Sequence, residues 1–174
     1  MKVFASCAAV LLLGACAGSS SAYYADEPLE EGNPSAYRAS QTTVEDGRAL
    51  EISRIGTYTH TGIHEPRRLI IRNETEWRSF WSDMDPGTRP DVDFNDYMVI
   101  AVAAGTKPTT GHSIRVERVG VDDSGRLIAE VIETQPGPEC LTAAQVTYPV
   151  DVVVVPRRDL RTWSFTERQD VRSC

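Results

Sequence analysis

The chain has 174 residues, of which 41% are hydrophobic and 25% are charged, a composition typical of one globular domain, with or without a small appendage. This composition excludes a multi-span membrane protein and a wholly disordered chain. Because 25 acidic residues face 18 basic ones, the net charge is -7, which argues against nucleic acid as a partner, since neutralising phosphates needs a surplus of cations.

The N-terminus has the pattern of an export signal. An apolar run follows Lys2 and is too short to span a bilayer, for which about 20 apolar residues are needed. The run ends in Leu13–Cys16, which resembles a bacterial lipobox, where the cysteine is lipidated and the chain is cut just before it. We therefore expect a lipoprotein signal peptide over residues 1–15 and lipidation of Cys16. The alternatives are an ordinary secreted protein cut after Ala22, or an apolar start with no signal function.

The resemblance to a lipobox implies a lipid-anchored protein of the bacterial cell envelope. Ala17 follows the cysteine in place of an aspartate, which in the known sorting pattern favours the outer membrane. Residues 16–45 are rich in Ser, Ala, Gly, Pro and acids and show no hydrophobic period. We expect this segment to be a flexible lipidated tether, and residues 46–174 to form a single β-rich domain.

Two cysteines remain once the signal peptide is removed and Cys16 is lipidated. They are Cys140 and Cys174, and an exported protein lies in an oxidising compartment. We expect them to form one disulfide that pins the C-terminal tail to the domain. The alternative is a pair of free thiols.

The domain is expected to begin near Leu50, with strands over residues 48–58 and 67–72. Asn73 then has the character of a helix N-cap, because Glu76 follows three residues later in the spacing of a capping box. These signals predict a helix over residues 74–83, ended by a Pro-Gly pair. The apolar side chains of one helical face favour core packing over a ligand platform; they are Trp77, Phe80, Trp81 and Met84.

From Tyr97 onward the pattern is that of β-strands. A nearly continuous apolar run predicts a strand buried on both faces, and two alternating segments, the first with one slip after Val116, predict a hairpin about Asp122–Gly125. The expected strands are residues 97–104, 113–121, 126–134, a stretch within 146–155, and 163–166. With no βαβ rhythm, the fold is expected to be mainly β, an antiparallel sandwich or half-open barrel with one short amphipathic helix.

No residues form a recognisable catalytic or metal-binding pattern. His60 and His64 have the spacing of a helical metal pair, but the glycine and proline around them favour an extended chain, which would separate them by roughly 13 Å. The alternate carboxylates of Asp91–Asp96 lack the glycine and glutamate of a calcium loop. A thiol–imidazole pair of His112 and Cys140 competes with the simpler disulfide. We therefore expect no enzyme, no cofactor and no metal.

Residues 99–157 carry an ordered series of turn and strand motifs. The motifs are G-x-K-P-T-x-G at Gly105–Gly111, Ser113-Ile114, E-T-x-P-G-P-x-C at Glu133–Cys140, Tyr148-Pro149, and a strand ending in Pro156. This segment resembles the C-terminal domain of the protease complex subunit PrcB family, from which it departs at His112, where the family usually has tyrosine. The resemblance implies a non-enzymatic envelope lipoprotein that associates with a secreted protease complex and stabilises it.

The two Gly/Pro-rich turns of this segment are the candidate partner-binding loops, because loops at the end of a sheet often carry recognition. Their residues are Lys107, Pro108, Thr109, Thr110, Gly111 and His112 in the first turn, and Pro136, Gly137 and Pro138 in the second. The alternative is that these prolines and glycines only shape the turns.

A second resemblance implies a different activity. Lys107–Gly111 is similar to the N-P-T-T-G loop of chagasin-like inhibitors of cysteine peptidases, which are immunoglobulin-like sandwiches. The first position is lysine here, Arg161–Trp163 matches their R-P-W loop only in part, and a G-x-G-G loop is missing from the sequence. This resemblance implies, as an alternative, a cysteine-peptidase inhibitor acting through Pro108–Gly111. A further alternative is a structural envelope lipoprotein with no link to a protease.

Overall fold

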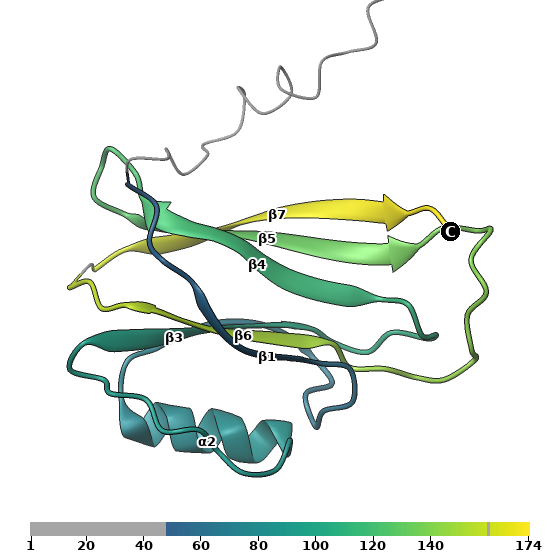
Figure 1. Cartoon of the computed structure of the whole chain (residues 1–174), viewed down its shortest axis with the longest axis horizontal. Helices are drawn as coiled ribbons and strands as arrows, with labels where there is room; N and C mark the ends of the chain where they lie inside the picture. Colours follow the sequence, from purple (N-terminus) through teal and green to yellow (C-terminus); the bar gives the residue numbers. More distant parts are fainter. Residues whose placement is uncertain (1–47, 160) are drawn as a thin grey trace, which may run out of the picture.

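The structure is a computed structural model that describes residues 48–159 and 161–174. The expected signal peptide, Cys16 and the tether lie outside the described residues. The described part of the chain forms two stacked β-sheets and one helix, and neither sheet closes into a barrel (Figure 1). The expected mainly β sandwich with one short helix is confirmed.

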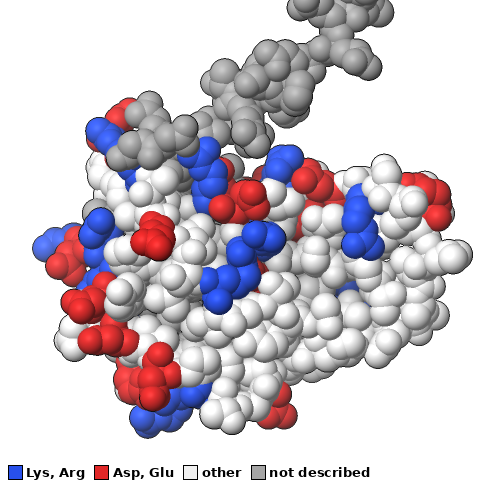
Figure 2. All heavy atoms as spheres, in the orientation of Figure 1, with Lys and Arg blue, Asp and Glu red and all other residues white. Residues whose placement is uncertain are grey.

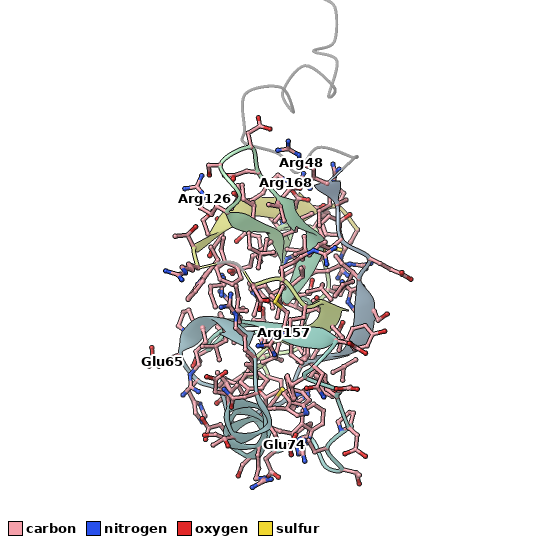
Figure 3. All side chains as sticks on the ribbon, turned by 90° about the vertical axis from the view of Figure 1, so that its left-hand side faces the viewer. Arg48, Glu65, Glu74, Arg126, Arg157 and Arg168 are labelled. Carbon is pink, nitrogen blue, oxygen red and sulfur yellow. A yellow bond between two sulfur atoms is a disulfide. The ribbon has the colours of Figure 1, made fainter. Side chains whose placement is uncertain are left out.

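The four-stranded sheet has the order β1-β6-β3-β2, and the three-stranded sheet has the order β4-β5-β7. The elements are β1 (Ser53–Tyr58), β2 (Pro66–Ile71), α2 (Glu74–Met84), β3 (Tyr97–Ala104), β4 (Ser113–Val121), β5 (Leu127–Pro136), β6 (Val150–Pro156) and β7 (Trp163–Arg172). The helix covers the outer face of the four-stranded sheet, so the domain has three layers, visible end-on in Figure 3.

One strand pair departs from the expected antiparallel arrangement. β7 pairs in parallel with β5 and runs to Arg172, six residues beyond the expected end at Thr166. The chain leaves β5 at one end of the sandwich, returns through β6 in the other sheet, and enters β7 in the direction of β5 (Figure 1). The expected length was wrong because the sequence after Thr166 is mostly charged or polar, as suits an exposed edge strand, and shows no hydrophobic alternation.

The alternation of β3 divides the core into two parts, and the strand is buried on both faces as expected. Its even-numbered residues, from Met98 to Ala104, pack between the two sheets with β4 and β5. Its odd-numbered residues, from Val99 to Ala103, pack against the helix. Because every second residue changes face, this one strand joins the three layers.

The helix follows the expected capping pattern. Asn73 Oδ1 accepts a hydrogen bond from the backbone N–H of Glu76 at 2.9 Å, and Glu76 Oε2 accepts one from the N–H of Arg72 at 2.9 Å. The helix ends at Met84, and its C-cap Asp85 has a φ of 49° and donates its N–H to the carbonyl of Trp81. All four apolar side chains of the predicted face are buried, so core packing is confirmed.

The slip in the alternation of β4 is a β-bulge. The pairing of β4 with β5 shifts between Val116 and Arg118, and it is regular on either side. The hairpin loop that follows closes with a hydrogen bond from Asp122 N–H to the carbonyl of Arg126 at 3.0 Å, and Gly125 supplies a φ of 76°. The predicted hairpin is therefore confirmed, and the bulge places Val119 on the same inner face as Ile114 and Val116.

Candidate partner-binding surface

The two Gly/Pro-rich turns lie at the same end of the sandwich. Residues 105–112 join β3 to β4, and residues 137–149 join β5 to β6, on the right-hand side of Figure 1. Gly111 has a φ of 92°, and a Cβ at this position would lie 3.2 Å from Pro136 Cβ and 3.5 Å from Thr142 Cγ2. Glycine at this position thus lets the two turns pack against each other. We call these two segments, with the C-terminal residues beside them, the loop end.

Backbone hydrogen bonds join the two turns. Lys107 and Thr147 exchange both of their backbone bonds, at 2.8 and 3.0 Å. Thr110 donates its N–H to the carbonyl of Ala143 at 3.1 Å, and its hydroxyl oxygen accepts the N–H of Ala143 at 2.9 Å. The longer turn is therefore held along its length and does not project as a free loop.

A disulfide fastens the longer turn to the last strand. Cys140 and Cys174 are bonded, with their Cα atoms 5.1 Å apart, as the sequence predicts. Gly137 donates its N–H to the carbonyl of Arg172 at 2.9 Å, and Cys174 donates its N–H to a carboxylate oxygen of Glu139 at 3.2 Å. Because Cys140 is bonded, its thiol is not available to His112 as a nucleophile.

The charged groups of the loop end are largely paired. Lys107 Nζ forms an ion pair with Glu133, and each side chain is about four-fifths buried. Burial lowers the pKa of His112, and the nearby charge of Lys107 lowers it further, while Glu133 partly opposes both effects. His112 is therefore neutral at neutral pH, and the charge of Lys107 in the first turn is balanced by Glu133.

Two exposed apolar side chains of the longer turn were not predicted from the sequence. Leu141 is 104% exposed and Val146 is 45% exposed, and the lower right-hand part of the face in Figure 2 carries few charged side chains. Of the predicted loop residues, Pro108 and Pro138 are exposed, Gly137 is buried, and the others are half-buried. The signal that would have found Leu141 is a large apolar residue directly after the cysteine of a Pro/Gly-rich turn.

The sequence did not predict the buried carboxylate of Asp151. Asp151 is fully buried in β6 and accepts hydrogen bonds from Arg54 Nε at 2.8 Å, Thr57 Oγ1 at 3.1 Å and the N–H of Val116 at 2.8 Å. The guanidinium of Arg54 also donates to the carbonyl of Val116 at 2.7 Å. The signal in the sequence is a single acid inside an otherwise apolar strand. Because its oxygens have several donors, Asp151 links the two sheets at the bulge of β4 and is not poised to act on a ligand.

The histidines and acids considered as ligands have other contacts. His60 Nε2 lies 3.0 Å from the side-chain amide of Gln145, and the ring of His64 packs edge-on against Tyr148, with the centroids 4.4 Å apart. Asp93 Oδ1 accepts two hydrogen bonds from Asn95. Within residues 48–159 and 161–174, no group of three or more His, Cys, Asp or Glu residues is placed to hold a metal ion. Over the same residues, no helix is long and apolar enough to cross a membrane.

Comparison with known proteins supports the first of the two resemblances. Residues 98–156 match the family model described as PrcB C-terminal. No curated protein and no solved structure matches the chain significantly. The family is one of protease complex subunits and is not a known catalytic domain. The segment that matches the PrcB C-terminal model runs from β3 to β6 and contains both turns of the loop end.

Proposed function

We propose that this protein is a non-enzymatic, lipid-anchored envelope protein that binds a protein partner, a secreted protease complex, through its loop end. The observation that carries the proposal is Leu141, which is fully exposed in a turn held by the Cys140–Cys174 disulfide and by the bonds to Thr110. A large apolar side chain on a well-held turn is typical of a binding anchor.

The energetics of such an anchor are favourable. Covering a leucine side chain contributes about 1.5–3 kcal/mol, which is roughly a tenfold to hundredfold gain in affinity. The turn is already ordered by its backbone hydrogen bonds, so binding loses little conformational entropy. Lys107 and Glu133 neutralise each other inside the protein, which leaves few charges to desolvate at the contact.

The PrcB C-terminal match supports a protease complex as the partner and stabilisation of that complex as the role. Inhibition through Pro108–Gly111 has weaker support. Thr110 uses both its N–H and its hydroxyl to hold Ala143, and Gly111 lies against Pro136. Pro108 is the one exposed residue of Pro108–Gly111, whereas the fully exposed large apolar side chain of the loop end is Leu141, which the inhibitor family's N-P-T-T-G loop does not include.

Binding is tested by purifying the full-length protein from native envelopes through an affinity tag placed within residues 16–45, outside the sequence of the loop end. Leu141→Asp is expected to reduce the recovery of the partner peptidase by about tenfold or more. Tyr97→Ala removes an exposed side chain at the opposite end of β3 and is the matched control, with recovery unchanged. Equal recovery with Leu141→Asp would show that the loop end is not the binding surface.

The same preparation distinguishes a stabilising subunit from an inhibitor and from a structural lipoprotein. A stabilising subunit is expected to lengthen the half-life of the peptidase activity, whereas an inhibitor would reduce the activity when it is added back. A preparation with no peptidase in stoichiometric amount would favour a structural envelope lipoprotein.

Lipid anchoring is tested by metabolic labelling with radioactive palmitate. The wild-type protein is expected to incorporate label and to fractionate with the outer membrane, and Cys16→Ser is expected to lose both properties. Unlabelled wild-type protein whose chain begins at Tyr23 would instead show cleavage after Ala22.

A further inference from the structure

β7 is one of the two edge strands of the three-stranded sheet, and it lies after the segment that matches the PrcB C-terminal model, which ends at residue 156. It pairs with β5 over ten consecutive residues, from Trp163 opposite Leu127 to Arg172 opposite Pro136, with no shift in register. Among the described residues, no strand pairs with its other edge. A long, regular, unpaired edge is a template for another strand.

The backbone groups that point outward can be identified. The carbonyl of Thr162 accepts the N–H of Leu127 at 3.1 Å, and the carbonyl of Arg172 accepts the N–H of Gly137 at 2.9 Å, so both point toward β5. Successive residues of a strand alternate between its two edges. The residues whose N–H and C=O groups point away from β5 are therefore Trp163, Phe165, Glu167, Gln169 and Val171.

The other edge strands of the sandwich are less suited to pairing. β1 has a register shift between Arg54 and Gly56, and β2 is only six residues long and begins with Pro66. In the sheet of β7, the opposite edge strand β4 has a bulge between Val116 and Arg118, and its Gly120 already forms a bridge with Ala49. Bulges, prolines and short length are the usual protections of an edge. β7 contains no proline, and the Cys140–Cys174 disulfide fixes its end beside the turn that bears Leu141.

We propose that the free edge of β7 binds an extended segment of the protein partner as an added β-strand, next to the contact made by Leu141. This proposal rests on the proposed function and adds a mode of binding to it. Glu167 accepts hydrogen bonds from Arg68 of β2 at 2.7 and 3.0 Å. On the other face of β7, Arg168 pairs with Asp170 at 3.1 Å, and Arg172, two residues further on, is an additional positive charge. The fitting segment therefore carries an acidic side chain on that face.

A second copy of this chain is a poorer occupant than a different protein. Two copies of β7 related by a twofold axis would pair antiparallel, with residues of the same face opposite each other. The two registers with the greatest overlap place Glu167 opposite Glu167, or Arg168 opposite Arg168. Like charges directly opposite in a strand pair are destabilising.

The test uses the full-length protein in its native envelope, with a photo-crosslinking amino acid in place of Thr166 on β7, and in place of Ser79 on the exposed face of α2 as a control. The Thr166 probe is expected to form a product with one other protein, and the Ser79 probe none. Gln169→Pro removes an outward N–H without breaking a bond to β5, and it should reduce the yield by roughly tenfold. Gln169→Ala is the matched control and should keep the yield.

Val171→Pro is the second edge variant, and thermal unfolding shows whether each variant is folded. The strand proposal is overturned if Thr166 gives no product, if a folded proline variant keeps the full yield, or if the product contains two copies of this chain. If Leu141→Asp removes the product and the proline variants do not, strand addition fails and the proposed function stands. If neither affects partner binding, both proposals fail.

Discussion

Asp151 shows how much a single residue contributes to the packing of the two sheets. It lies on the inner face of β6, together with Val153 and Val155, and it reaches the N–H of Val116 where the bulge of β4 interrupts the ladder. A buried carboxylate is tolerated only when donors surround it. Arg54, Thr57 and the backbone of Val116 provide those donors, from β1 and from the opposite sheet.

Replacing Asp151 with alanine is expected to lower the free energy of unfolding by about 3 kcal/mol, the lower end of the cost of breaking a buried ion pair. The lower end applies because the side chain of Arg54 is 26% exposed and can turn toward water, while the N–H of Val116 stays buried without an acceptor. Urea unfolding measures the loss. Asp159→Ala, at a side chain that is 96% exposed, is the control and should change stability by less than about 0.5 kcal/mol.

Asp122 gives the fold an acid-sensitive turn. Hydrogen bonds from the Ser124 hydroxyl and the N–H of Arg126, together with the charge of Arg126, lower the pKa of Asp122 from 3.8 to about 2. The folded protein therefore binds this proton more weakly than the unfolded chain does. Its contribution to stability is complete above about pH 4 and is lost as the pH falls through the folded value of about 2.

The measurement is an NMR titration of the Asp122 carboxyl together with melting temperatures from pH 5 to pH 2. The midpoint is expected near pH 2, and the difference in melting temperature between the wild type and Asp122→Asn should shrink as the pH falls below about 4. A midpoint close to 3.8, the ordinary value, would contradict the role of the turn.

At the scale of the elements, the stability of α2 depends on the hydrogen bonds of its first turn. Asn73 caps it by accepting the N–H of Glu76, and Glu76 returns a bond to the N–H of Arg72. Asn73→Ala is expected to lower stability by about 1 kcal/mol. Asn73→Asp keeps an acceptor and adds a negative charge at the helix N-terminus, so it should leave stability within about 0.5 kcal/mol. Thermal melting compares the two variants, and equal losses would show that the cap bond contributes nothing.

The elements that were predicted well have local signals. The cap of the helix, the apolar run of β3 and the slip after Val116 each depend on neighbours within a few residues, and each appears in the structure. β7 has no such signal, because its partner β5 lies more than thirty residues earlier and its own sequence is polar. Its parallel pairing follows from the path of the whole chain, which a pattern of side chains does not contain.

The candidate binding surface was predicted only in part, because some of its features depend on contacts between residues far apart in the sequence. The sequence located the two turns that meet at the loop end and the cysteines that hold it. It did not identify which side chains stay exposed, because exposure depends on how the turns pack. Thr110 and Gly111 face the other turn, whereas Leu141 has nothing beside it. The link from Arg54 to Asp151 was missed because the partners are 97 residues apart.

On the scale of the whole molecule, arginines close both open sides of the sandwich. Arg54 reaches across between β1 and β4, and Arg68 of β2 binds Glu167 of β7 on the other side. Next to that pair, the guanidinium of Arg72 lies 5.0 Å from the ring centroid of Trp163, and its Nε and Nη2 are buried without hydrogen-bond partners among the described residues. The indole face is the group that stabilises this charge. The arginine contacts thus lie along the two sides of the sandwich, and the loops that join the strands lie at its two ends.

The Cys140–Cys174 disulfide stabilises the conformation of the loop end. It closes a loop of 34 positions between Cys140 and Cys174, and removing such a link is expected to lower stability by about 3–4 kcal/mol. The double variant Cys140→Ser/Cys174→Ser should therefore melt about 10 °C below the wild type. The bonds of Thr110 to Ala143 and of Lys107 to Thr147 remain, so the turn should loosen mainly around Leu141.

Limited proteolysis with an enzyme that cuts after leucine measures this loosening. Cleavage at Leu141 is expected to be slow in the oxidised protein and at least about tenfold faster in the double variant, because local opening becomes easier once the link is lost. Binding of the partner should fall in parallel, since the anchor must then be ordered at the moment of contact. If cleavage is faster and binding is unchanged, the partner does not depend on the fixed shape of this turn, and the contact made by Leu141 loses its support.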